Sequence, residues 1–184
     1  MTASVFIGMS LEGFIARSNG AFDFLPAGGG EPHGYDEFMA TVDALLIGRK
    51  TFDSVLKLDS WPYGAKPVFV LSTRTPATAP PGAIVEHMSG DPSDIITQLE
   101  ARGIRHIYVD GGITVQKFLC AGLIQRLIIT RVPVLIGEGI PLFGPLSGDI
   151  CLRHIATRSF RSGLVQSEYH MECISGGCTV PPLW

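Results

Sequence analysis

Two segments of the chain combine a glycine with groups that can bind phosphate. In the first, Gly48 follows the apolar residues 44–47 and precedes the cations Arg49 and Lys50 and the hydroxyl of Thr51. A strand that ends in glycine and opens a helix leaves free backbone N–H groups, which attract anions. Two cations in a first helical turn are unfavourable unless an anion lies there. The segment predicts a phosphate site, and the alternative is a solvated pair of charges.

The second segment runs from Val109 and Asp110 into the paired glycines Gly111 and Gly112. A side chain at either glycine would keep a pyrophosphate from the helix end, whereas the pair lets backbone amides face it. The G-x-G-x-x-G fingerprint of Rossmann-type dinucleotide sites is absent from the sequence. The alternative interpretation is a tight turn that needs positive φ.

A third segment places hydroxyls and a guanidinium at the end of an apolar run. It comprises Leu71, Ser72, Thr73 and Arg74, and it could meet the ribose phosphate of a nucleotide. Ligands of open α/β sheets bind beyond the carboxyl ends of the strands. Three strand ends that carry phosphate-binding groups therefore make a nucleotide site a stronger interpretation than any one of them does alone.

Acidic side chains near the expected cleft are Asp23, Asp36, Glu37 and Glu138. Each could orient a substrate or hold a proton if it were partly buried, although most acids in loops are solvated. The five histidines form no HxxxH pair, and the sequence has no CxxC pair, Gly-x-Ser-x-Gly elbow or GxxxxGK[ST] loop. Metal, hydrolase and P-loop chemistries thus lack support.

Composition indicates a single domain that handles small molecules. The 184 residues carry a formal charge of −3 and are 46% hydrophobic, which suffices for one core. No basic block offers a nucleic-acid surface. Four cysteines make no disulfide framework, so a reduced, cytoplasmic setting is expected. No signal peptide is evident, and the longest uncharged run, residues 173–184, is shorter than the roughly 20 residues that span a bilayer.

Strand and helix patterns alternate along the chain, which is typical of an α/β protein with a mainly parallel sheet. A long loop rich in glycine and proline covers residues 17–34, and residues 151–160 and 164–174 form a terminal antiparallel hairpin. The predicted strands are 3–9, 44–47, 67–71, 83–86, 106–109 and 125–133, and the predicted helices are 35–42, 49–56, 92–101 (with Asp91 as its cap) and 112–121.

The order of these segments resembles the dihydrofolate-reductase-like superfamily, and within it the group related to the C-terminal reductase domain of the bifunctional riboflavin-biosynthesis deaminase/reductase. The resemblance implies a three-layer αβα fold, with a mainly parallel mixed sheet and an antiparallel C-terminal hairpin. It implies one domain over residues 1–174, followed by a tail at 175–184. The matching segments are residues 9–16, 19–20, 23–25, 46–52, 70–74, 109–112 and 133–143.

The resemblance also implies that the cofactor is NADPH. The loop after the first strand would close over the nicotinamide, with Asn19 and Gly20 in its mobile part. The residues implied to hold the cofactor fall into four groups. They are Gly8, Ile15 and Ala16 at the nicotinamide; Gly48, Arg49, Lys50 and Thr51 at the phosphates; Leu71, Ser72, Thr73 and Arg74 at the adenosine ribose and its 2′-phosphate; and Gly111, Gly112, Ile113, Thr114 and Val115 at the pyrophosphate.

For the substrate, the resemblance implies an acid on the first helix, for which Asp36 is the counterpart. The proton would come from Asp36 or from water. Phe24 and Phe38 could stack on a substrate ring or pack in the core, and Glu138 is a further substrate-binding candidate. The zinc signature of the deaminase half is absent.

The favoured function is therefore an NADPH-dependent reductase that transfers a hydride to a pterin or a riboflavin-precursor aminopyrimidine. One alternative is a non-catalytic NADPH-binding or regulatory module, and another is a structural domain without cofactor. The expected partner is a small-molecule substrate, with no nucleic acid and no membrane. A homodimer is also expected, through the apolar run at residues 127–136 and the terminal hairpin.

Overall fold

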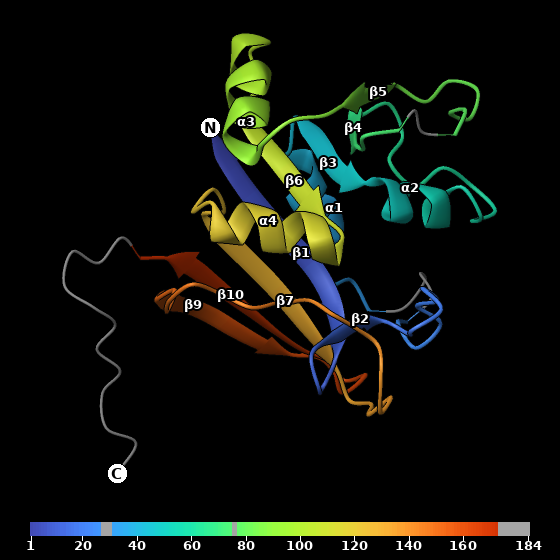
Figure 1. Cartoon of the computed structure of the whole chain (residues 1–184). Coiled ribbons are helices and arrows are strands. Elements are labelled where there is room, and N and C mark those ends of the chain that lie inside the picture. The colour runs from blue at the N-terminus through green and yellow to red at the C-terminus, as the bar shows by residue number, and fades with distance from the viewer. Residues whose placement is uncertain (27–30, 75–76, 173–184) are drawn as a thin grey trace.

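The computed structural model describes residues 1–26, 31–74 and 77–172. Its centre is an eight-stranded sheet (Figure 1), in the order β5 (Val85–Met88), β4 (Val68–Leu71), β3 (Ala44–Gly48), β6 (His106–Asp110), β1 (Thr2–Ser10), β7 (Arg126–Val132), β10 (Val165–Met171) and β9 (Leu152–Ser159). The strands from β5 to β7 are parallel to one another. The hairpin of β9 and β10 is antiparallel, and β10 pairs with β7. The α/β class and the antiparallel C-terminal hairpin are confirmed.

Helices cover both faces of the parallel part of the sheet. In Figure 1, α3 (Pro92–Ala101) and α4 (Gly112–Cys120) lie in front of the strands, and α1 (Tyr35–Ala40) lies behind them. One core packs α3 and α4 against alternate side chains of β1. A second core packs α1 and α2 (Arg49–Val55) against the other face of β3 and β4. These two cores make the three layers that the resemblance implies.

The alternation along β1 shows how one strand serves both cores. Val5, Ile7 and Met9 are buried on the side of α3 and α4, whereas Phe6 contacts Phe38 of α1. Successive side chains of a strand point to opposite faces, so the apolar run at the start of the sequence can fill both layers. Burial of each such side chain stabilises the fold by about 1.5–3 kcal/mol.

A small second sheet lies beside the carboxyl end of β1. Its strands are β2 (Phe14–Ala16) and β8 (Ile140–Pro141), which pair antiparallel. The sequence analysis predicted neither strand, because two or three residues carry too little periodicity to be recognised. We call this pair the β2–β8 ribbon.

The other predicted elements are present with small shifts. β5 begins two residues later than predicted, because its pairing with β4 sets Val85 opposite Val68 and buries Met88. α1 ends at Ala40 rather than at residue 42. Asp91 stands at the N-cap of α3, but its side chain makes no capping hydrogen bond. The end of the hairpin at residues 173–174 and the tail at 175–184 lie outside the described residues.

Cys151 is disulfide-bonded, which differs from the expectation of reduced cysteines. Cys120 is a free thiol and is exposed, and the other two cysteines lie outside the described residues. Over the residues that the structure describes, no helix has the length and hydropathy needed to cross a bilayer.

Candidate functional site

The two strand-to-helix corners predicted to bind phosphate lie against each other. β3 and β6 are neighbouring parallel strands, so the starts of α2 and α4 emerge at the same edge of the sheet. A Cβ added at Gly48 would lie 2.8 Å from the Oγ1 of Thr114, and a Cβ added at Gly111 would overlap the Oγ1 of Thr51. Each glycine therefore faces the threonine of the other corner. Gly111 also has a positive φ of 94°, which only glycine adopts without strain.

The cations of the first corner lie at the start of α2. Arg49 is half-buried, and its guanidinium forms an ion pair with Asp53 one turn later, at 3.1 Å. Both side chains are about 40% exposed, so solvent weakens this pair, and an anion could compete for the guanidinium. Lys50 is exposed and forms no ion pair within the described residues.

The third predicted segment lies next to this corner. Leu71 at the end of β4 pairs with Gly48 of β3, so Ser72 begins close to the start of α2. The hydroxyl of Ser72 accepts the backbone N–H of Arg74 at 2.9 Å, which forms a tight turn. His87 supports this turn through a hydrogen bond between its Nε2 and the Ser72 carbonyl at 2.6 Å. Thr73 and Arg74 are exposed and available to a ligand.

Asp110, at the end of β6, is the acid whose ionisation the fold changes most. Burial raises its pKa to about 6, although its Oδ1 accepts the backbone N–H of Gly111 at 2.7 Å. Burial also raises the pKa of three tyrosines on this face, and the charge of Asp110 adds to each shift. The pKa of Tyr35 rises to about 12, and those of Tyr63 and Tyr108 rise further.

Sequence reasoning quoted Asp110 only as part of a glycine turn and did not select it as a site residue. A signal was available, because an acid that ends a buried strand and lies two residues from Tyr108 shares its face of the sheet. A carboxylate there must be desolvated by the core, and a perturbed pKa marks candidates for acid–base work.

The four predicted catalytic and substrate residues are placed in different environments. Asp36 is exposed on α1, and Glu138 is exposed after β7. Phe38 is only 4% exposed and packs between Phe6 and Tyr108, with ring centroids 5.0 and 5.2 Å away, which is the core-packing alternative. Phe24 is half-buried, with the guanidinium of Arg17 5.9 Å from its ring centroid.

Of the residues predicted to contact the nicotinamide, Ile15 lies against the start of α4. A Cβ added at Gly112 would be 3.2 Å from the Cδ1 of Ile15 and 3.1 Å from the carbonyl of Pro141, so the β2–β8 ribbon packs directly on this helix end. Gly8 faces the loop after β2, since a Cβ there would be 2.9 Å from the Cδ2 of Leu25.

The loop after β2 is also held by its own side chains. Arg17 forms an ion pair with Asp23 at 2.6 Å, and the side-chain oxygen of Asn19 accepts the N–H of Ala21 at 2.9 Å. Within α4, Val115 is fully buried in the core and Ile113 is exposed. Val115 could therefore contact a ligand only through its backbone.

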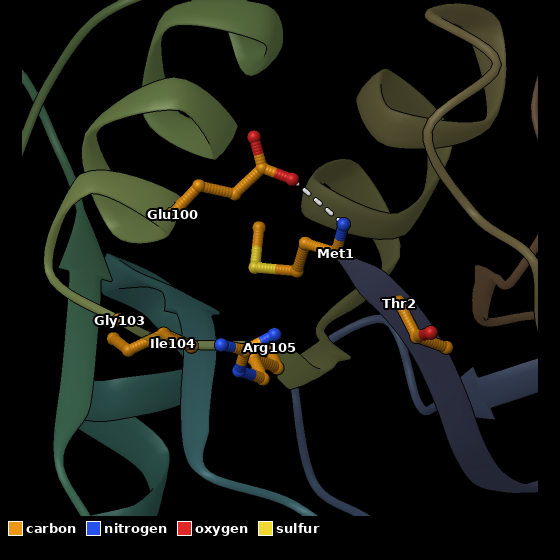
Figure 2. Close-up of a pocket in the computed structure, with 6 residues that line it drawn as sticks. All are labelled: Met1, Thr2, Glu100, Gly103, Ile104 and Arg105. Atoms are coloured by element: carbon orange, nitrogen blue, oxygen red, sulfur yellow. Dashed lines mark hydrogen bonds and ion pairs between the residues drawn. The ribbon is translucent and has the colours of Figure 1, made fainter.

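A separate hollow of about 440 Å³ lies at the opposite edge of the sheet. Figure 2 shows its lining, with the amino group of Met1 paired to Glu100 at 2.6 Å and with Thr2 at the start of β1. None of the predicted site residues lines it. Across residues 1–26, 31–74 and 77–172, no three His, Cys, Asp or Glu side chains gather where they could hold a metal ion.

The donors at the carboxyl edge fit a phosphorylated dinucleotide. Gly48 and Gly111 set the two corners together, and the first amides of α4 have no partner within the helix. Arg49, Lys50 and Arg74 supply positive charge along the same edge. This set suits several separate phosphates better than it suits a metal or an apolar ligand.

Comparison with known proteins gives a consistent picture. The family model described as the RibD C-terminal domain matches residues 2–165. The chain is 33% identical to the uncharacterized protein YwjB of Bacillus subtilis over 159 residues, which are 85% of this chain and 90% of YwjB. The crystal structure of a putative riboflavin biosynthesis protein from Shewanella sp. PV-4 matches with 39% identity and a TM-score of 0.84, and covers 94% of this chain and 99% of that one.

A more distant match shows the breadth of the fold. Dihydrofolate reductase from Enterococcus faecalis, complexed with NADP(H) and RAB-propyl, is 16% identical with a TM-score of 0.62. The match covers 92% of this chain and 96% of the reductase. At this identity the match shows a shared fold alone.

Proposed function

Because the chain belongs to the RibD C-terminal domain family, as the resemblance in its sequence indicated, we propose that it is an NADPH-dependent reductase. Its substrate would be a conjugated heterocycle, either a pterin or an aminopyrimidine of the riboflavin-precursor type. The relative from Shewanella sp. PV-4 is named for riboflavin biosynthesis, which agrees with reduction of a flat nitrogen heterocycle.

The observation that carries this proposal is the interlocked pair of glycine corners. Gly48 and Gly111 bring the starts of α2 and α4 together at one edge of the sheet, beside Arg49 and Lys50. Free amides at the start of α4 and cations close to it favour a pyrophosphate. A purely structural domain has no need for two cations at the start of this helix.

Arg74 supports NADPH over NADH. It is exposed, follows the turn at Ser72, and lies beside the start of α2. A guanidinium binds a phosphate with two parallel hydrogen bonds, so the 2′-phosphate of the cofactor is a suitable partner. NADPH, when bound, supplies the hydride, and the protein supplies the binding and alignment.

We propose that Asp110 holds the proton for the reaction. The role predicted for the exposed Asp36 from the sequence stays a prediction. With a pKa of about 6, Asp110 holds a proton in a useful fraction of molecules near neutral pH. Tyr35 lies within electrostatic reach of both acids and is half-buried, so it could line the substrate. The rate is expected to fall as the pH rises through about 6, because the carboxylate form of Asp110 has no proton to give.

A homodimer is the assembly we propose. β9 is the outer strand of the sheet, and neither of its faces is buried. Its Leu152 and Ile155 are 41% and 40% exposed, and Val165 at the start of β10 is 37% exposed. An edge strand presents unpaired backbone N–H and C=O groups that can pair with a strand of another chain. A second copy of the chain would supply such a strand.

The proposed location is the cytoplasm, where disulfides such as that of Cys151 are uncommon. Alkylation of free thiols during cell lysis, followed by mass spectrometry, measures the oxidised fraction of Cys151 in the cell. A cytoplasmic location predicts that this disulfide is reduced in most molecules inside the cell. A fully oxidised Cys151 would place the protein elsewhere.

The test of activity is the loss of NADPH absorbance with a panel of dihydropterins and ribosylated aminopyrimidines. We expect one of these classes to be reduced, and Asp110→Asn to lower kcat while NADPH still binds. Saturable NADPH binding without oxidation across the panel would favour the non-catalytic module. Asp59→Asn removes an exposed carboxylate outside the site and serves as the control.

A further inference from the structure

One carboxylate fastens the turn after β1 to the segment that follows β7. The Oε2 of Glu12 accepts the backbone N–H of Ile136 at 2.6 Å, and its Oε1 accepts that of Gly137 at 3.1 Å. The hydroxyl of Ser10 also reaches Oε2, at 3.5 Å, and accepts the N–H of Phe14 at 3.2 Å. Glu12 thus joins the entrance of β2 to residues more than 120 positions later in the chain.

Two backbone hydrogen bonds flank this carboxylate. The N–H of Leu11 donates to the carbonyl of Val134, and the N–H of Leu142 donates to the carbonyl of Gly13, both at 3.0 Å. Hydrogen bonds to an ionised acceptor are stronger than those between neutral groups. Without Glu12, the amides of Ile136 and Gly137 would have no acceptor among the described residues.

The segments that Glu12 joins carry the β2–β8 ribbon between them. Ile15 lies against the start of α4, where a Cβ at Gly112 would approach it to 3.2 Å. On the other side, a Cβ added at Gly139 would overlap the carbonyl of Ala16 and lie 3.0 Å from the Cβ of Phe14. The ribbon is therefore closely packed on both sides, and a small shift at its entrance moves Ile15 and Ala16 relative to the pyrophosphate corner.

We propose that Glu12 is a positioning residue for the nicotinamide half of the cofactor. The inference rests on the proposed function, since Ile15 and Ala16 matter in this way only if they face that ring. In this role Glu12 acts through the backbone that it holds and needs no contact with the cofactor or the substrate. Its carboxylate holds Ile136 and Gly137, and through them it fixes the β2–β8 ribbon over the start of α4.

Titrations with two ligands separate positioning from a general structural role. The ligands are NADPH and adenosine 2′,5′-bisphosphate, which lacks the nicotinamide. In Glu12→Ala, NADPH should bind about tenfold more weakly, while the bisphosphate should bind as it does to wild type. Glu12→Asp should restore part of the NADPH affinity, and Asp59→Asn should behave as wild type. Glu12→Gln, which keeps one acceptor oxygen, replaces Glu12→Ala if that variant does not fold.

Equal weakening of both ligands in Glu12→Ala would overturn the positioning role, and so would no change in either. If wild type binds the bisphosphate but not NADPH, or binds neither, the proposed function fails and this inference fails with it. A measurement that needs no ligand separates these cases. Amide hydrogen exchange should quicken at residues 14–16 and 136–142 in Glu12→Ala and stay unchanged elsewhere, and unchanged exchange there would contradict the fastening itself.

Discussion

At the scale of single residues, Asp110 shows how a buried carboxylate at the proposed site can lower the stability of the fold. The core around the end of β6 disfavours the carboxylate and raises its pKa from 3.8 to about 6. The folded protein thus binds this proton more tightly than the unfolded chain does. Ionisation of Asp110 destabilises the fold fully above pH 6, and the penalty disappears as the pH falls to about 4. A structural role alone gives no reason to keep an acid here.

Asp110→Asn tests this account. The amide removes the charge and can still accept the N–H of Gly111 through its Oδ1. We expect the variant to be more stable than wild type by about 2–3 kcal/mol at pH 8, and of similar stability at pH 4. Denaturant unfolding at both pH values measures the difference. A gain that is the same at both would mean that the ionisation of Asp110 is not its cause.

The same residue shows what sequence reasoning could and could not reach. The strand-to-helix corners at Gly48 and Gly111 could be recognised because glycine at a strand end is a local pattern, and their phosphate role stays a prediction. Asp36 was selected and Asp110 was not, because burial depends on which strands become neighbours and which tyrosines cover them. The pattern of residues 108–110 indicates which face Asp110 shares, but the extent to which its carboxylate is desolvated depends on the assembled core.

At the scale of elements, glycine at two corners lets the helices that follow β3 and β6 begin side by side. Gly48 has a φ of −76°, which any residue can adopt. Glycine is needed there only because a side chain would collide with its neighbour. The neighbour is the hydroxyl of Thr114 at the start of α4. The pair fixes the spacing of the two helix starts and thereby the width of the proposed phosphate site.

A double-mutant cycle at this contact is a direct measurement of its role. Gly48→Ala should destabilise the protein by about 1–3 kcal/mol, because the methyl group has no space beside Thr114. Thr114→Ala in the same chain should recover most of this loss, giving a coupling of about 1 kcal/mol or more. Gly148→Ala, where a Cβ meets nothing within 4 Å, is the control. Additive losses would show that the two corners do not touch.

Elements were predictable in proportion to their length and local pattern. The strands of the parallel sheet and the terminal hairpin came from apolar runs, and each is present. The β2–β8 ribbon could not be predicted from the sequence, since its strands have three and two residues and their pairing depends on contacts between distant parts of the chain. β5 was displaced because the register of β4 decides which residues pair, whereas the apolar run at 83–86 does not.

At the scale of the whole molecule, the sheet is covered unevenly. Helices protect the strands from β5 to β7, whereas β9 is not buried on either face. Figure 1 shows the β9–β10 hairpin extending beyond the helical layers. This asymmetry separates the proposed cofactor edge from a lateral surface that a second copy could cover without blocking the proposed site.

The dimer proposal predicts a mass of twice 19.8 kDa by light scattering after size exclusion. Ile155→Arg should shift the protein to the monomer, because a buried unpaired charge at the pairing edge is unfavourable. Ile84→Arg makes the same change at a residue 47% exposed beside β5, and should leave the dimer intact. A monomeric wild type, or an Ile155→Arg variant that stays dimeric, would exclude this surface.

The central claim concerns the cofactor edge, and one titration tests it most directly. Wild type, Arg74→Ala and the control Arg161→Ala are titrated with NADPH and with NADH, and binding is followed by ligand fluorescence. We predict micromolar binding of NADPH to wild type, weakened about tenfold or more in Arg74→Ala and unchanged in Arg161→Ala, with weaker NADH binding that Arg74→Ala does not alter. Binding of neither nucleotide by wild type would contradict the reductase assignment and leave only the fold.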